Sequence, residues 1–434
     1  NKALKQREED LRDIRALRDL VRGHYGLPEN PRGMTASTIR LAKIWNAMSM
    51  LTGFLAASVD VGRLGTYFKM RETFGGTFAS LFKDLGNLKK GIKLSNKQMM
   101  TFGEGWDLFN GSRMRMFTEM GDTSLGLSKF QSWADKAQTG YFQFINGMAS
   151  WNAAVKSIAS MMWNTEVINV LLKWDKTDEI SKLRKLRLAN AGISVNKKNP
   201  VTSKILKGLK QKNGYLKGDY IRVADTARWS NDAKYAWEAA LAHDIPKIIV
   251  TPSKGDVALW MNTQWGGLLA QFKKFSQAAT NRVLTAGIQE GHQPFLKGAV
   301  LLIGMGAFVD FVRTEYNFDR SYAAKSWSQK FYDALERSAL LGYFMDINKS
   351  IEALTDNKVG VRPIFQIGHK YPTSLASKSG ALFGPSGTTT VRLFDTLAGI
   401  PNGMDYHTRR NVRRLSPTGQ VFWLDTPYDY MFGT

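Results

Sequence analysis

The side chains of this chain that offer recognisable chemistry at close spacing are basic. Residues 181–222 hold twelve Lys and Arg residues against one acidic residue, Asp219. A run of charge is often only a solvated surface, but a surplus this dense favours contact with a polyanion, because phosphates neutralise several cations together. The residues that we expect to make this contact are Lys182, Arg184, Lys185, Arg187, Lys197, Lys198, Lys204, Lys207, Lys210 and Lys212.

A second basic group lies near the end of the chain. It consists of Arg409, Arg410, Arg413 and Arg414, which a helical turn would bring to one side. Such a row fits contact with phosphate, and it fits equally well a docking site on an acidic groove of a neighbouring subunit. No motif that reads DNA or RNA accompanies either group, so we expect any nucleic-acid contact to be electrostatic and independent of base sequence.

Residues for covalent, metal or acid–base chemistry are sparse. The chain has no Cys, which excludes disulfides, thiolate metal sites and Cys nucleophiles, and its five His show no metal-ligand spacing. A phosphate-binding P-loop, a zinc-protease HExxH and a nucleophile elbow are absent from the sequence. Glu104 lies between two glycines without an identifiable partner carboxylate, so we interpret it as a surface residue. We therefore expect no catalytic residue, metal or cofactor here, and no enzyme activity.

Composition is that of a folded and strongly basic protein. Hydrophobic residues make up 43% of the 434 residues, which is enough to build buried cores. The 60 Lys and Arg exceed the 37 Asp and Glu and give a net charge of +23. Such a surplus points to a nucleic acid, an anionic lipid or an acidic protein face as partner. The first residue is Asn1 rather than Met, so we expect a fragment of a longer polypeptide.

Apolar periodicity predicts an all-α, multi-helix protein with about two helical subdomains. Residues 246–252 read as an extended connector between two prolines, and we place the boundary there. Residues 225–242 predict a helix that turns Trp229 and Trp237 inward. The expected divisions are an N-terminal amphipathic helix and linker (1–34), a helical subdomain with the basic segment (35–250), a second helical subdomain (251–354) and an irregular Gly/Pro-rich tail (355–434).

Within these divisions, residues 255–289 have the clearest helical pattern. Residues 35–64 predict one long helix, with Ser37 or Thr38 as its N-cap. Frequent Gly and Pro beyond residue 355 leave room only for short helices such as residues 391–398.

Two apolar runs are candidates for burial, residues 44–59 and residues 298–309. Both are shorter than the ~18–20 residues of a comfortable membrane-spanning helix. We interpret both as buried core helices, with membrane contact as the lesser alternative. In the second run, the small residues Gly304 and Gly306 would let a neighbouring helix approach closely. Residues 327–354 predict one or two further helices.

Three segments resemble a known family. Residues 269–276 (LAQFKKFS), followed by Asn281 and Arg282, resemble a QFK-x-F-[ST] helix near the C-terminus of the large internal virion proteins of short-tailed phages. Residues 40–85, with Asn46, Ala47 and Gly53, are similar to a second block of these proteins. Residues 334–342 (ALERSALLG), followed by Met345 and Asp346, are similar to a third block in the same order.

The resemblance implies a protein of the capsid inner core that leaves before the genome and builds a conduit across the host envelope. Members of the family often carry a lytic transglycosylase domain at the N-terminus. No residues of this chain match that domain, so we expect it only in a part of the polypeptide that precedes these residues.

The resemblance and the charge together lead to one expected function, an internal virion protein that assembles in the capsid core and helps form a conduit for DNA delivery. The expected partners are further copies of the chain, other phage core or portal proteins, double-stranded DNA bound without sequence specificity, and a host membrane. The expected location is the virion interior and, after ejection, the host cell envelope. The alternative is a structural adaptor, or the encapsidation domain of a giant polyvalent virion protein such as a virion RNA polymerase, docked on the portal or core.

Overall fold

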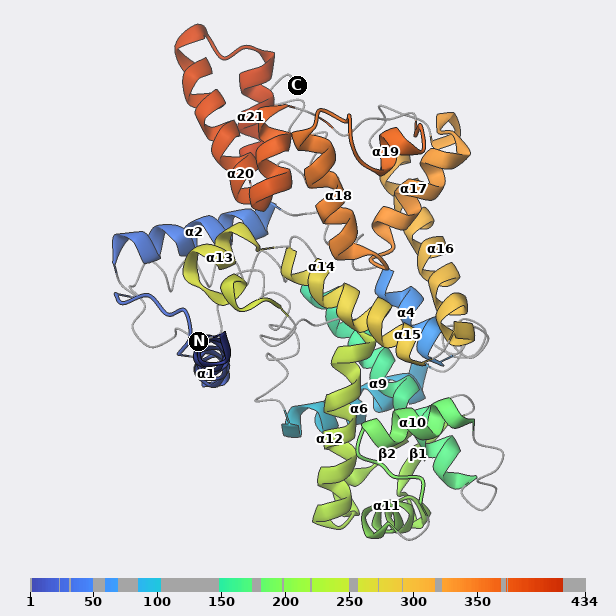
Figure 1. Ribbon diagram of the computed structural model, residues 1–434. Helices are drawn as coiled ribbons and strands as arrows, with labels where there is room; N and C mark the ends of the chain where they lie inside the picture. Colours follow the sequence, from blue (N-terminus) through green and yellow to red (C-terminus); the bar gives the residue numbers. More distant parts are fainter. Residues whose placement is uncertain are drawn as a thin grey trace.

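A computed structural model gives the fold of most of the chain. It describes residues 2–22, 24–30, 33–49, 59–68, 85–102, 148–173, 181–196, 199–218, 221–249, 257–271, 273–290, 292–316, 322–367, 372 and 374–416. Within these ranges the regular elements are helices, apart from one two-stranded antiparallel hairpin (Figure 1). The predicted all-α, multi-helix fold is thereby confirmed.

The N-terminal half supplies one set of helices and the hairpin. Its elements are α1 (Lys2–Val21), α2 (Met34–Ser49), α4 (Val59–Phe68), α6 (Leu85–Phe102), α9 (Met148–Leu172), α10 (Lys182–Asn190), α11 (Pro200–Lys210), β1 (Tyr215–Lys217), β2 (Arg222–Ala224), the 3-10 helix η4 (Thr226–Arg228) and α12 (Asn231–Ile248).

The C-terminal half is more finely divided. Its elements are the 3-10 helix η6 (Leu259–Asn262), α13 (Gln264–Leu269), α14 (Lys273–Ala279), the π-helix η7 (Thr280–Thr285), α15 (Ala286–Glu290), α16 (His292–Tyr316), η8 (Tyr322–Ala324), α17 (Trp327–Arg337), α18 (Gly342–Leu354), α19 (Val361–Ile364), α20 (Leu375–Gly399), η9 (Ile400–Asn402) and α21 (Tyr406–Leu415).

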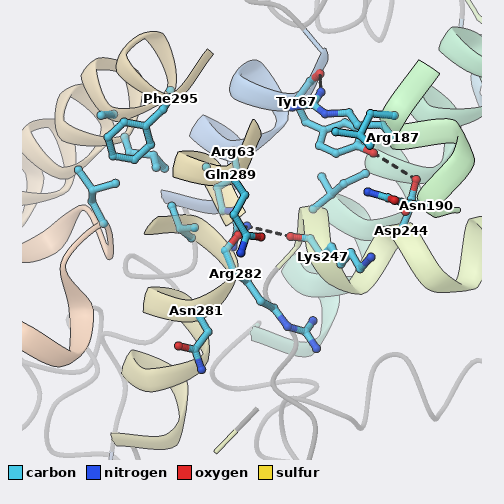
Figure 2. A pocket seen from close by; sticks show the side chains of 18 residues that line it. Arg63, Tyr67, Arg187, Asn190, Asp244, Lys247, Asn281, Arg282, Gln289 and Phe295 are labelled. Atoms are coloured by element: carbon cyan, nitrogen blue, oxygen red, sulfur yellow. Dashed lines mark hydrogen bonds between the residues drawn. The ribbon is translucent and has the colours of Figure 1, made fainter. Parts of the chain in front are cut away.

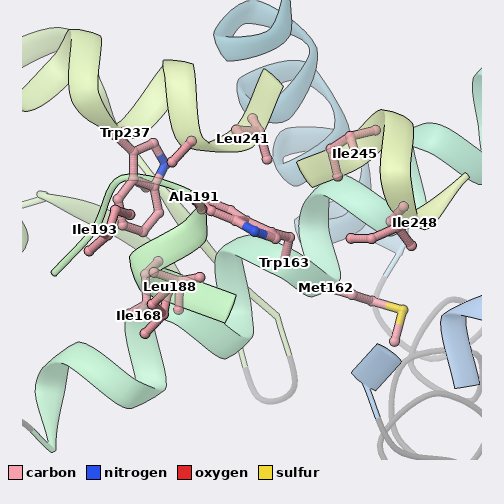
Figure 3. Close-up of a cluster of buried hydrophobic side chains, with 14 of the residues drawn as sticks. Met162, Trp163, Ile168, Leu188, Ala191, Ile193, Trp237, Leu241, Ile245 and Ile248 are labelled. Atoms are coloured by element: carbon pink, nitrogen blue, oxygen red, sulfur yellow. The ribbon is translucent and has the colours of Figure 1, made fainter. Parts of the chain in front are cut away.

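The largest core joins α4, α9, α10, α11 and α12, in the lower part of Figure 1. Trp163 of α9 and Trp237 of α12 meet edge to face with their ring centroids 5.2 Å apart (Figure 3). Trp229 continues the row at 5.4 Å from Trp237, and it lies so close to Gly208 that a Cβ there would come within 2.7 Å of the ring. The predicted inward placement of both α12-region tryptophans is confirmed.

A second packing centre lies where α16 crosses α17. A Cβ on Gly306 would lie only 2.1 Å from the carbonyl oxygen of Ala334, so the two backbones touch at this point. One turn along, the fully buried Asp310 accepts hydrogen bonds from Lys325 Nζ at 2.7 Å and from Arg337 Nε at 2.9 Å. The close approach predicted for Gly306 is confirmed, whereas Gly304 faces open space.

A polar junction ties α2 to two later segments of the chain. The Asn46 side chain donates to Gln271 Oε1 at 3.3 Å and to Ser386 Oγ at 2.8 Å. Thr389 Oγ1 donates back to Asn46 Oδ1, and Gln271 donates to the Lys43 carbonyl at 2.7 Å. Residues more than two hundred positions apart thus share one buried hydrogen-bond network.

The predicted continuous helix over residues 255–289 is wrong. The segment turns sharply between η6 and α13. The turn requires glycine at position 266, because a Cβ there would lie 1.9 Å from the Trp260 carbonyl oxygen. Thr263 caps the new helix by accepting from the Gly266 amide, and Trp265 is exposed rather than inward. The apolar residues of this segment are therefore divided among η6, α13 and the consecutive helices α14, η7 and α15.

The chain around residues 246–252 also differs from the prediction of an extended connector. Pro246 lies inside the last turn of α12, where a proline removes only one amide donor. Residues 250–252 lie outside the described ranges. Similarly, α2 begins at Met34, ahead of both expected cap residues Ser37 and Thr38, and α4 covers the far end of the predicted long helix.

The expected irregular tail is largely helical up to residue 416. α20 folds back on itself at Gly384, whose φ of +64° is open to glycine, and Pro385 then starts the second arm. Thr388 Oγ1 reaches the Ala376 carbonyl across the arms at 3.1 Å, a contact that a straight helix would not allow. Glycine and proline here mark helix ends in a compact hairpin rather than loops. Residues 417–434 lie outside the described residues, as do residues 50–58, 69–84 and 103–147 before α9.

The two glycines of α16 make a matched pair for testing the α16–α17 contact. We expect Gly306→Ala to lower the free energy of unfolding by about 1–3 kcal/mol, because the added methyl group collides with the α17 backbone. Gly304→Ala has open space and should raise stability by up to about 1 kcal/mol through helix propensity. Denaturant unfolding followed by circular dichroism measures both. Equal effects of the two substitutions would contradict the close contact of α16 with α17 at Gly306.

Candidate polyanion-binding surfaces

The basic segment forms two capped helices rather than one continuous surface. Ser181 caps α10 by accepting from the Arg184 amide. Asn199 caps α11 by accepting from the Val201 and Thr202 amides, and Pro200 occupies the first helical position. The hairpin of β1 and β2 closes the segment against α9. The expected contact residues are therefore presented from different helices.

The arginines of α10 turn toward the protein interior. Arg184 pairs with Glu166 of α9 at 2.9 Å. Arg187 donates to the Tyr67 carbonyl at 2.7 Å and lies 4.0 Å above the Tyr67 ring. These two guanidinium groups join α10 to α9 and α4. Lys182 on the same helix is exposed and Lys185 is half-buried.

The lysines of α11 and of the turn after it remain on the outside. The opposite face of α11 buries Ile205 and Leu209 in the core, which leaves Lys204, Lys207, Lys210 and Lys212 exposed. Lys204 forms an ion pair with Asp232. Within the described ranges, the other three lysines make no ion pair. Lys197 and Lys198 are outside the described residues.

The arginines near the chain end lie on a helix, as their spacing requires. Asp405 caps α21 by accepting from the Thr408 amide at 2.8 Å. Gly399 at the end of α20 lies so close to Thr408 that a Cβ would come within 1.9 Å of its hydroxyl oxygen. This contact brings α21 alongside the second arm of α20, at the upper left of Figure 1.

Three arginines of these two helices, Arg392 of α20 and Arg410 and Arg414 of α21, lie near enough for their charges to repel one another. Burial, followed by the nearby Arg414 and Arg410, lowers the pKa of Arg392 to about 10. Burial and then Arg410 also lower the pKa of Arg414. In the part of the chain that the structure describes, Arg392, Arg410 and Arg414 form no ion pair. Among the described residues, these like charges therefore lie together without an acidic partner, an arrangement that favours the binding of an anion.

Arg392 is the residue that sequence reasoning missed. It lies in an otherwise apolar stretch with Leu393 and Phe394, both exposed, and its only signal was a cation in an expected short helix. Two of the four predicted arginines, Arg410 and Arg414, join it in the cluster. Arg409 and Arg413 occupy the neighbouring row and are half-buried.

One apolar helix outside the basic surfaces is partly exposed. Within the described ranges, the single helix long and apolar enough to cross a membrane is Phe295–Glu315, and only 28% of its most apolar window is buried. Leu296, Val300 and Phe308 form an exposed row at multiples of four residues. The interpretation of residues 298–309 as a buried core helix is therefore wrong for this face. Periodicity missed it because α16 is apolar on all sides.

Metal binding has no candidate site among the described residues. They contain no group of three His, Asp or Glu that could hold a metal ion. Glu104 lies outside them, so its assignment as a surface residue stays a prediction. The chain as a whole matches no protein-family model, no curated protein and no solved structure.

The arginine cluster predicts a measurable response to anions. At low ionic strength, Arg392→Met should raise the melting temperature, because the variant keeps the apolar stem and removes the repulsion. Sulfate should stabilise the wild type more than this variant. Lys358→Met, at an exposed cation in the turn after α18, is the control and should change neither quantity. A lower melting temperature for Arg392→Met at low salt would argue against the cluster.

Proposed function

We propose that this chain belongs to an internal virion protein of a short-tailed phage, which assembles in the capsid core and helps to form a conduit for DNA across the host cell envelope. The conduit would contact double-stranded DNA through phosphates alone. The observation that carries this proposal is the cluster of Arg392, Arg410 and Arg414, which mutual repulsion and burial prepare for a polyanion.

The kind of basic surface matters for a conduit. DNA that moves must be neutralised without being read or held in one register, and contacts to phosphate meet that need. The exposed lysines of α11 offer such contacts on flexible side chains, and the α20–α21 arginines offer more rigid ones. A sliding polymer is better served by two surfaces of different stiffness than by a single tight site.

The packing of the three resembling segments also supports the proposal. Asn46, from the first segment, contacts Gln271 from the second. Gly342, from the third, lies so close to Ser276 of the second that a Cβ would come within 2.9 Å of its carbonyl oxygen. Segments that resemble one family and adjoin one another in space are what a shared tertiary unit would produce.

The exposed apolar helices support the expected protein and membrane partners. α18 leaves Phe344, Ile347, Ile351 and Leu354 exposed at alternating steps of three and four residues, which is the spacing of helix–helix interfaces. The exposed row of α16 is long enough for a bilayer contact. Large exposed apolar surfaces of this kind mark contacts with other subunits or with membranes.

A salt titration of DNA binding tests the electrostatic part. We expect the wild type to bind two unrelated duplexes equally. In Arg410→Gln/Arg414→Gln, the slope of log affinity against log salt should fall by about 2, since each lost phosphate contact removes about 0.9. Lys89→Gln/Lys90→Gln, an exposed pair on α6, is the matched control and should keep the wild-type slope. Absence of DNA binding at low salt would contradict the conduit proposal.

Neutralising the α11 lysines distinguishes the conduit proposal from the adaptor alternative. If Lys204, Lys207, Lys210 and Lys212 contact DNA, their change to Gln weakens DNA binding and leaves oligomerisation and core assembly intact. If they dock on acidic portal or core surfaces, assembly is lost instead. The second outcome would favour the adaptor or encapsidation domain.

Flotation with anionic liposomes tests the membrane contact. We expect Val300→Asp/Phe308→Asp to abolish flotation and to leave thermal stability nearly unchanged, because both side chains are exposed. Leu11→Asp/Ile14→Asp on α1, two other exposed apolar positions, should float like the wild type. Equal flotation of both double variants would show that α16 does not make the membrane contact.

A further inference from the structure

The cations around the cavity between the two halves of the fold serve the fold itself. This cavity, of about 550 Å³, lies between α4, α10 and α12 on one side and η7, α15 and α16 on the other (Figure 2). Arg63 and Arg282 donate from its walls to main-chain carbonyls in the last turn of α12, at 2.8 and 2.6 Å. Lys247 is exposed, and its Nζ lies 2.9 Å from Nε2 of His243. The two arginines therefore attach α4 and η7 to the end of α12.

α1, by contrast, is attached to the rest of the protein near its C-terminal end. Leu20 is buried there, and the turn that follows packs on η6, where a Cβ on Gly26 would lie 2.6 Å from the Asn262 carbonyl oxygen. Every residue in the range 2–15 is exposed. Figure 1 shows α1 end-on, below α2 and apart from the large core. Most of this helix therefore has no packing within the fold.

An apolar row runs along the exposed part of α1. It consists of Leu4, Leu11, Ile14 and Leu17, whose side chains are between 43% and 61% exposed. Leu4 and Leu11 are one heptad apart, and Ile14 follows after three residues, which is the spacing of a coiled-coil seam. A helix of about 20 residues is only marginally stable in water unless it packs an apolar face. The row is therefore suited to be covered by a partner.

The charges of α1 indicate what kind of partner covers the row. α1 carries six Lys and Arg and five Asp and Glu, so it is nearly neutral in a chain of net charge +23. A helix that lies on an anionic membrane has a basic polar face, which these acids interrupt. Mixed charges beside an apolar seam are typical of a helix that pairs with a helix of the same kind. α1 of a second copy of this chain is such a helix.

Two charges on one flank of the row fit an antiparallel pair. Glu8 and Arg15 are seven residues apart on the same side of the row, and among the described residues neither forms an ion pair. In an antiparallel pair with Leu11 opposite Ile14 of the second copy, Glu8 lies opposite Arg15 of the second copy. Two-fold symmetry repeats both contacts, so the helix is complementary to itself.

Arg7 and Arg18 lie in the row as well and limit the affinity of such a pair. Arg18 is bound to Asp19 at 2.7 Å, and the aliphatic stems of both arginines can cover the ends of the seam. Polar residues in a seam lower its stability while they fix the register and the number of helices. A reversible pair follows from this composition, rather than a permanent one.

We infer that α1 pairs with α1 of a second copy in an antiparallel coiled coil, with Leu11 and Ile14 in its seam and Glu8 opposite Arg15 of the second copy. The inference gives a surface to the self-assembly that the proposed function contains, and only in this respect does it rest on that function. The proposed contacts with DNA and with the membrane lie on other helices.

Analytical ultracentrifugation of the purified chain over a range of concentrations tests the inference. We expect a monomer–dimer equilibrium for the wild type. Glu8→Arg and Arg15→Glu should each weaken dimerisation at least about tenfold, because each places like charges opposite one another twice per dimer. Glu8→Arg/Arg15→Glu restores opposite charges and should dimerise like the wild type. Glu9→Arg, on the opposite face of α1, changes the net charge as Glu8→Arg does and is the matched control.

Three results would overturn the inference. The first is a wild type that stays monomeric at millimolar concentration, and the second is equal dimerisation of Glu8→Arg and Glu9→Arg. The third is a double variant that stays as weak as the single ones, since in a parallel pair Arg15→Glu would face Asp10 of the second copy. Thermal unfolding of each variant shows that the fold is retained.

Two further measurements separate this inference from the proposed function. Leu11→Asp/Ile14→Asp should be monomeric and still float with anionic liposomes; lost flotation would make lipid the partner of α1 and overturn the inference. A wild type that dimerises through α1 without binding DNA supports the inference and contradicts the conduit. A monomeric wild type that binds DNA contradicts the inference alone.

Discussion

Buried guanidinium groups connect helices of this protein that are distant in sequence. Arg362 lies between Glu352 and Glu336 and joins α17, α18 and α19, while Arg337 reaches Asp310 across the α16–α17 contact. The chain has no cysteine, and the described part contains only a single small hairpin. Long-range order must therefore come from packing and from side chains that carry several donors. A guanidinium group with five N–H donors can serve a carboxylate and a carbonyl together.

This use of arginine explains why net charge is a poor guide to the binding surface. Arg184 and Arg187 belong to the densest basic segment of the sequence, yet they connect α10 to its neighbours. Arg392 comes from a segment of ordinary composition and lies among like charges. What separates the two groups is the presence of an acceptor inside the fold. A cation that finds one stabilises the structure, whereas a cation that meets only other cations favours an external anion.

α16 links three features that are far apart in chemical character. One face carries Gly306 and the buried Asp310, and it docks on α17. A second face, with Phe295 and Ala299, closes the cationic cavity. A third, with Val300 and Phe308, is exposed. The apolar character of the whole helix follows from these three separate demands.

The sequence by itself determined the class of the fold and several local features. Periodicity placed α1, α12, α17 and α18, the row of arginines on α21 follows from spacing, and Gly306 was identified as a point of close approach. Each of these depends on residues within a few turns of one another. Local spacing is sufficient in such cases, because side chains three and four residues apart share a helix face whatever surrounds them.

Only the tertiary structure decided the rest. Gly384 and Gly266 mark reversals between packed helices, and sequence reasoning had read the first as part of a loose tail and the second as part of a continuous helix. The meeting of Arg392 with Arg410 and Arg414, the inward turn of Arg187 and the cavity between the two halves join residues that are distant along the chain. Glycine permits a tight turn and a close helix contact alike, and a charge acts according to its neighbours in space. Local spacing does not show whether a glycine forms a turn or a helix contact, or which neighbours a charge has. Both depend on the packing of the whole chain.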